Sequence, residues 1–135
     1  MAVIAPDGSL VLTLPYPPSV NHYWLNSVGR SKRGKPCVHT RISERGRRYT
    51  QAVEALTAGV EPIDGEVSVT LLVWMPDRKK RDLDNLLKCV LDSLTKAGVW
   101  GDDSQVDELR IVRKGITSPY GKVIVRIKQL EAMLF

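Results

Sequence analysis

Residues 82–98 carry the sequence DLDNLLKCVLDSLTKAG, which holds the clearest secondary-structure signal in the chain. Its apolar residues recur every three to four positions, and this period predicts an amphipathic helix. Asp82 is of a residue type that caps helix starts, and Gly98 suits the position that follows a helix end. The pattern predicts a helix from Asp82 to just before Gly98, with one face in the core formed by Leu83, Leu86, Leu87, Val90, Leu91 and Leu94.

The segments around this helix predict four strands and one more helix. Apolar alternation predicts strands at residues 9–14, 66–73, 106–114 and 122–128, with a turn at 118–121 between the last two. The second helix is predicted from the i, i+3, i+4, i+7 spacing of Tyr49, Ala52, Val53 and Leu56, with Gly59 as its stop. Residues 19–40 contain Gly, Pro and Asn among many cations, which predicts a long loop.

The resulting order is β-α-β-α-β-β. Helices that connect strands imply a mixed sheet with both helices packed on it, so the expected fold class is α+β. A length of 135 residues, with 43% hydrophobic and 26% charged residues, suits one domain over residues 1–135. The sequence shows neither an apolar run of membrane-spanning length nor a signal-like N-terminus, so a cytoplasmic protein is expected. Cys37 and Cys89 lack metal-site spacing and are expected to be reduced.

The charge distribution suggests a polyanionic ligand. The chain has 20 Lys and Arg against 15 Asp and Glu, which gives a net charge of +5. The cations gather in two clusters that suit a nucleic acid, although charge runs are as often simply solvated. One cluster is Arg30, Lys32, Arg33, Lys35, Arg41, Arg45, Arg47 and Arg48, and the other is Arg78, Lys79, Lys80 and Arg81.

Carboxylates follow the second basic cluster at once. Asp82 and Asp84 lie where the helix dipole favours anions, and Lys88 shares a helix face with Asp84. Asp102 and Asp103 follow the helix and would return toward Asp82 if the next strand paired near the end of the strand before the helix. Such a cluster could hold Mg²⁺ while the cations hold a phosphate backbone. Chemistry alone leaves open that these residues only cap, pair and form turns.

A longer pattern resembles the RusA family of Holliday junction resolvases. It comprises residues 75–86, Lys88, residues 92–98, Trp100, residues 102–103 and 105–106, and the upstream segment 14–21. The resemblance implies a homodimeric, Mg²⁺- or Mn²⁺-dependent endonuclease, typical of phages and prophages, that nicks opposed strands of four-way DNA junctions in recombination and repair. The 25–40 segment is longer than in the short family pattern, and the residues ahead of the first strand also depart from it.

The resemblance also implies roles for individual residues. Asp82 and Asp84 match the paired catalytic, metal-binding aspartates, Asp103 the third, and Lys88 the essential lysine, while Asp102 is an acidic neighbour. DNA binding is expected at the four cations of the 25–40 segment and at residues 78–81. The former are Arg30, Lys32, Arg33 and Lys35.

Two other functions fit parts of the pattern. A non-catalytic DNA-binding module would leave the acids beside a phosphate-binding surface unexplained, because carboxylates repel DNA. A phosphohydrolase acting on nucleotides would leave the dispersed cations unexplained, and the sequence has no Gly-rich phosphate loop. The aromatic residues Tyr16, Tyr23 and Trp24 could stack on bases, but packing on the domain is the favoured interpretation. The apolar tail, Leu130 and residues 132–135, is expected to pack on a partner subunit.

Overall fold

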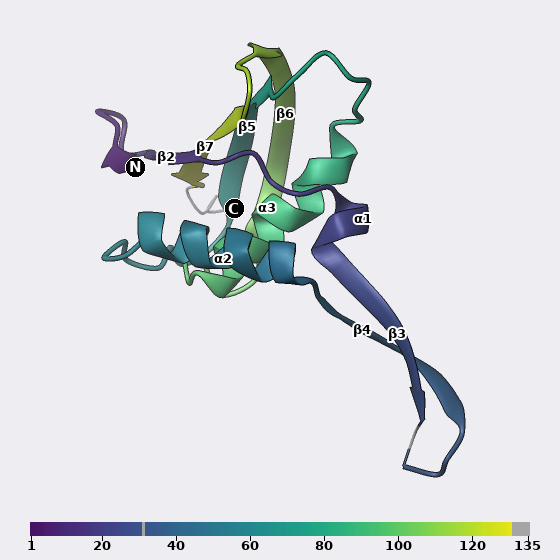
Figure 1. Ribbon diagram of the computed structural model, residues 1–135. Coiled ribbons are helices and arrows are strands. Elements are labelled where there is room, and N and C mark those ends of the chain that lie inside the picture. The colour runs from purple at the N-terminus through teal and green to yellow at the C-terminus, as the bar shows by residue number, and fades with distance from the viewer. Residues whose placement is uncertain (31, 131–135) are drawn as a thin grey trace.

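The computed structural model describes residues 1–30 and 32–130, and its centre is a five-stranded mixed sheet (Figure 1). β5 and β6 are parallel, and all other neighbouring strands are antiparallel. The expected mixed sheet is therefore confirmed. The spatial order is β1 (Ala2–Ile4), β2 (Leu10–Leu14), β7 (Lys122–Gln129), β5 (Val67–Met75) and β6 (Val106–Ile116).

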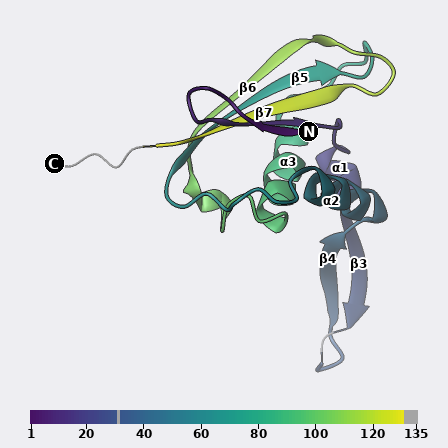
Figure 2. The ribbon, with the colours of Figure 1, turned by 90° about the vertical axis from the view of Figure 1, so that its left-hand side faces the viewer.

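Three helices cover one face of this sheet (Figure 2). They are α1 (Val20–Tyr23), α2 (Glu44–Leu56) and α3 (Asp84–Lys96). Every second residue of β5 points at the helices and is fully buried, because side chains alternate across a strand. The core lies between the sheet and the helices, and it includes Val67, Val69, Leu71, Val73, Val123, Val125, Leu86, Val90 and Leu94.

The predicted helix α3 is confirmed, but Asp82 is not its N-cap. Leu83 holds that position with helical angles, φ −63° and ψ −35°. The carbonyl of Asp82 already accepts a 3.3 Å bond from the Asn85 N–H, so the chain enters the helix through a tight turn that leaves the Asp82 side chain outward. Gly98 ends the helix as expected. It adopts φ 79°, and the Val99 N–H bonds the Leu94 carbonyl at 3.1 Å.

Helix α2 is also confirmed, with different ends. It begins after Ser43, whose hydroxyl accepts a 3.1 Å bond from the Gly46 N–H. It ends at Leu56, where the Thr57 hydroxyl bonds the Val53 carbonyl at 2.8 Å. Gly59 was predicted as the stop, but it lies in the turn beyond the helix with φ 82°.

The prediction of a loop over residues 19–40 is wrong. The segment forms α1 and an antiparallel hairpin of β3 (Trp24–Arg30) and β4 (Pro36–Ile42), which projects away from the rest of the molecule (Figure 1). The outer part of the hairpin buries no core face. Its facing residues Val28 and Val38 remain 78% and 69% exposed, so the usual strand alternation was missing. The short β1 was missed as well.

Among the helices of residues 1–30 and 32–130, none is long and apolar enough to cross a membrane. The predicted contact of the apolar tail falls on residues 131–135, outside the described residues.

Candidate active site

The segment between β5 and α3 lines a cavity of about 500 Å³. One wall is this segment and the first turns of α3, and the facing wall is the chain that leads from β2 into α1. Asp82 lies at this cavity, whereas Asp84 and Asp103 do not line it. The lining residues are Tyr16, Pro17, Pro18, Ser19, Asn21, His22, Arg45, Pro76, Lys80, Arg81, Asp82, Asn85 and Leu86.

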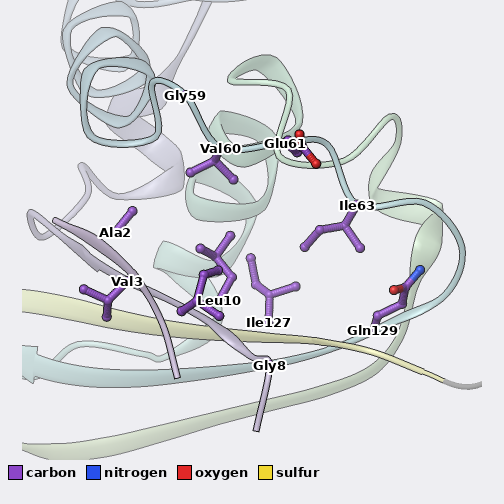
Figure 3. Close-up of a pocket in the computed structure, with 11 residues that line it drawn as sticks. Ala2, Val3, Gly8, Leu10, Gly59, Val60, Glu61, Ile63, Ile127 and Gln129 are labelled. Carbon is purple, nitrogen blue, oxygen red and sulfur yellow. The ribbon is translucent and has the colours of Figure 1, made fainter. Parts of the chain in front are cut away.

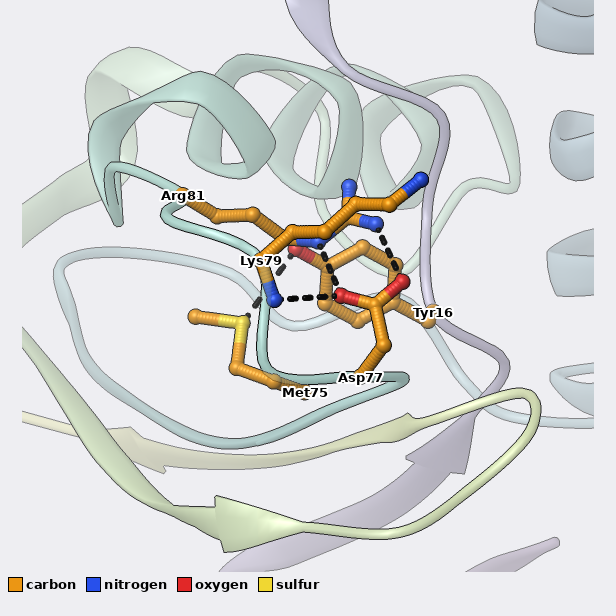
Figure 4. A network of polar contacts seen from close by, with 5 residues as sticks. All are labelled: Tyr16, Met75, Asp77, Lys79 and Arg81. Atoms are coloured by element: carbon orange, nitrogen blue, oxygen red, sulfur yellow. Dashed lines mark hydrogen bonds and ion pairs between the residues drawn. The ribbon is translucent and has the colours of Figure 1, made fainter.

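Asp77 organises the basic segment of residues 78–81 (Figure 4). Its carboxylate accepts two bonds from the Arg81 guanidinium, at 2.8 and 3.3 Å, and one from the Lys79 N–H at 3.0 Å. These bonds hold the pKa of Asp77 below its ordinary value, with the Arg81 bond the largest cause. Arg81 also lies over the ring of Tyr16, 5.9 Å from its centroid. Asp77 was not among the predicted site residues; its signal was an Asp four positions before an Arg.

Because Asp77 pairs with Arg81, Asp82 and Asp84 are left without a cation. Both are exposed at the start of α3, and neither carboxylate makes a hydrogen bond or ion pair within the described part of the chain. Lys88 is exposed one turn further along the same face and forms no ion pair with Asp84 in those residues. The start of α3 therefore presents two unpaired carboxylates and a lysine to solvent.

Asp102 has a local structural role. Its side chain accepts a 2.7 Å bond from the Ser104 hydroxyl, which is the main reason that its pKa is lowered. It caps the short 3₁₀ helix η1 (Asp103–Gln105), in which the Gln105 side chain accepts bonds from the Gly101 and Asp102 N–H groups at 2.8 and 3.1 Å. This arrangement fixes Asp103 at the entry to β6.

The structure separates Asp103 from Asp82 and Asp84. β6 starts beside the start of β5, where Val106 pairs with Val67, whereas Asp82 follows the end of β5 at Met75. Helix α3 bridges the two ends, and its 13 residues span about 20 Å at about 1.5 Å per residue. The predicted return of residues 102–103 toward Asp82 is therefore wrong within one chain. In residues 1–30 and 32–130, no three His, Cys, Asp or Glu residues lie close enough to hold one metal ion.

The predicted DNA-binding cations occupy two places. Arg30, Lys32, Arg33 and Lys35 lie at the tip of the β3–β4 hairpin, all exposed, far from the sheet (Figure 1). Residues 78–80 are exposed beside Asp82, while Arg81 is partly withdrawn by Asp77. Arg45 joins this second group from the first turn of α2, because it lines the 500 Å³ cavity. The sequence did not link Arg45 to the acidic residues.

The aromatic residues pack, as favoured from the sequence. Tyr23 is fully buried, and its hydroxyl donates a 2.5 Å bond to Asp92 of α3. Burial, followed by this bond, raises the pKa of Tyr23 to about 12. Lys96 bonds Asp92 at 3.2 Å and lies over the ring of Trp24. These contacts anchor the base of the hairpin to α3.

A second cavity, of about 410 Å³, lies at the other end of the sheet (Figure 3). Val3, Leu10, Val60, Ile63 and Ile127 give it an apolar lining, in which Glu61 is the one ionisable side chain of the described lining. It contains none of the predicted catalytic residues, and its chemistry does not suit a phosphodiester.

Comparison with known proteins points to one family. The family model described as "Endodeoxyribonuclease RusA" matches residues 15–128. The crossover junction endodeoxyribonuclease of Enterobacteria phage HK97 is 36% identical over 124 residues, covering 89% of this chain and 94% of that protein. Those of Enterobacteria phage 82 and Escherichia coli strain K12 are 40% and 38% identical over 109 residues, covering 78% of this chain and 83% of each relative.

Proposed function

Because this chain belongs to the RusA family of endodeoxyribonucleases, we propose that it is a Holliday junction resolvase. It would nick opposed strands of a four-way DNA junction during recombination and repair, as a single endonuclease domain over residues 1–135. The similar proteins are named crossover junction endodeoxyribonucleases, and the family match covers both the basic hairpin and the acidic start of α3.

One observation carries this proposal. Asp82 and Asp84 are exposed and unpaired among the described residues, although they directly follow a basic segment. Carboxylates so close to cations would normally form ion pairs, but here Asp77 takes Arg81 and leaves the other two available. Available carboxylates beside exposed Arg and Lys are suited to hold a divalent cation next to a bound phosphate.

The donor set fits Mg²⁺, or Mn²⁺ in its place. Mg²⁺ takes oxygen ligands and is commonly bound by one or two carboxylates together with water and substrate phosphate. Asp82 and Asp84 would supply the two carboxylates. The bound ion would activate water and stabilise negative charge on the phosphate. Asp103 would be a third ligand, but the fold keeps it at the other end of α3, so it cannot join Asp82 and Asp84 of its own chain.

The chain's own cations would do the rest. Lys88, exposed on the face of α3 that carries Asp84, would contact the scissile phosphate and stabilise the charge that develops on it. Arg78, Lys79 and Lys80 would hold the adjacent phosphates. Arg81 would contribute less, because its guanidinium is paired with Asp77. Asp102, which caps η1, would position Asp103 rather than bind the ion.

We further propose that the protein acts as a homodimer. A four-way junction needs two cuts on opposed strands, and each chain carries one Asp82–Asp84 pair. Two copies related by a twofold axis would match the approximate symmetry of the junction, and twofold dimers are the commonest oligomers. The hairpin tips, with Arg30, Lys32, Arg33 and Lys35, would grip the DNA backbone away from the cut sites.

Cleavage assays with Mg²⁺ on a four-way junction, a matched duplex and free nucleotides test the proposal. We expect paired nicks in the junction and little cutting of the duplex. Asp82→Asn and Asp84→Asn should bind the junction at least as tightly as wild type but not cut it, because each change removes a ligand charge and a repulsion toward phosphate. Glu54→Gln, an exposed acid on α2, is the control and should cut normally. Binding without cutting by the wild type would indicate a non-catalytic module, and hydrolysis of nucleotides alone would indicate a phosphohydrolase.

A further inference from the structure

β6 is the outermost strand on one side of the sheet, and its free edge is long. It spans 11 residues and pairs with β5 on one side, while no other strand of the described chain pairs with it on the other (Figure 1). Unpaired backbone N–H and C=O groups along such an edge can bond a strand of another chain. Leu109 and Ile116 on this strand are 44% and 48% exposed, which is unusual for apolar residues of a sheet that has a well-formed core.

The charges along β6 make this edge complementary to itself in one direction. The strand begins with Asp107 and Glu108 and ends with Arg113 and Lys114. Charges on an edge strand usually discourage pairing. Two parallel copies of β6 would indeed place like charges together, but two antiparallel copies place the acidic start of each strand beside the basic end of the other. Centred on the middle residue, Ile111, such pairing sets Glu108 opposite the partner's Lys114, twice by symmetry.

Antiparallel pairing would also bring the separated aspartates together. Asp103 directly precedes the start of β6. Asp82 lies near the end of β6, because the Arg113 guanidinium bonds the carbonyl of Arg81. When a second β6 runs in the opposite direction, the start of one strand meets the end of the other. A twofold axis perpendicular to the sheet keeps the helices of both copies on the same face, so Asp103 faces the same region as Asp82 of the partner subunit.

We infer that two copies of this chain pair antiparallel along β6, and that Asp82 and Asp84 of one copy form one metal site with Asp103 of the other. The inference rests on the proposed function, since that function gives Asp103 its role as a ligand. It explains why no single chain assembles the three carboxylates among its described residues, and it makes the dimer necessary for each cut.

Mixing two inactive variants tests whether the site is shared. In a dimer of one Asp84→Asn chain and one Asp103→Asn chain, a shared arrangement leaves one site with all three aspartates and places both substitutions in the other. A 1:1 mixture should therefore recover roughly a quarter of the wild-type nicking rate, because half of the dimers are mixed and each has one of two sites intact. Asp82→Asn mixed with Asp84→Asn is the matched control and should stay inactive. If the first mixture also stays inactive after subunit exchange, the shared site is refuted.

Charge reversal tests the interface without any cleavage. Glu108→Lys alone and Lys114→Glu alone each replace two attractive cross-strand pairs by repulsive ones, so the dimer dissociation constant should rise at least roughly tenfold. Both changes in one chain restore the pairs and should restore the dimer, as measured by sedimentation equilibrium. Ile111→Cys should form an intermolecular disulfide on mild oxidation, with the wild-type chain as the control.

These measurements separate the two proposals. A wild type that resolves junctions, while its dimer is indifferent to charge reversal and the Asp84→Asn and Asp103→Asn mixture is inactive, would overturn the β6 interface and leave the function standing. A dimer that responds to charge reversal, formed by a protein that cuts no junction, would support the interface and overturn the function.

Discussion

Neutralising the hairpin tip should weaken binding to every DNA form and reduce its salt dependence. The change is Arg30, Lys32, Arg33 and Lys35 to Gln, all exposed at the end of the β3–β4 hairpin. The hairpin projects from the body and buries little there, so the variant should fold normally (Figure 1). If each side chain contacts one phosphate, each loss lowers the slope of log affinity against log salt by about 0.9.

Four lost contacts would lower this slope by about 3.6. Between about 50 and about 200 mM salt, the affinity of the wild type should then fall about 150-fold more than that of the variant. Fluorescence anisotropy with a labelled junction at several salt concentrations measures the slope directly. A duplex of the same sequence should show a similar change, because phosphate contacts carry no sequence information.

The control neutralises Arg126 and Lys128 of β7. Both are exposed, and they alternate with the buried Val125 and Ile127, so they lie on the face of the sheet opposite the helices. Their removal should leave the slope nearly unchanged. If the hairpin variant keeps the wild-type slope, or if the control lowers it equally per charge, the hairpin does not contact DNA and the charge effect is general.

Three further predictions concern single side chains. Lys88→Ala should lower the single-turnover cleavage rate far more than the affinity, because a cation at the scissile phosphate acts on the transition state; an unchanged rate at saturating protein would exclude Lys88 from the reaction. Gly46→Ala should destabilise the fold by about 1–3 kcal/mol in urea, since a Cβ there would lie 2.6 Å from Ile42 Cγ2 and 2.8 Å from the Tyr23 carbonyl, whereas Gln51→Ala on the exposed side of α2 should be nearly neutral. Tyr23→Phe should cost about 1–2 kcal/mol at neutral pH through the lost bond to Asp92. The wild type should also lose stability between pH 10 and 12, because the raised pKa of Tyr23 makes its ionisation oppose folding there, and the Phe variant should lack this part of the loss.

Local patterns in the sequence were sufficient for the elements that border the core. Helix α3 and strands β2, β5, β6 and β7 each have a buried face, so their apolar residues follow the period of the element. The same reasoning could not find the β3–β4 hairpin, whose outer part has no face on the core and therefore no apolar period to detect. The cap of α3 was also beyond it, because Leu83 or Asp82 can begin the helix equally well until the turn before it is known.

The candidate site shows the same division at longer range. The run of residues 77–84 by itself identified the acids, the adjacent cations and the family resemblance, because these depend on residue type and spacing. Which acids lie near each other was decided by tertiary structure alone. The parallel pairing of β6 with β5 starts at Val106 and Val67, and it places Asp103 a full helix length from Asp82. That register results from packing β6 beside β5 after the α3 crossover, a contact between residues some forty positions apart that no local spacing encodes.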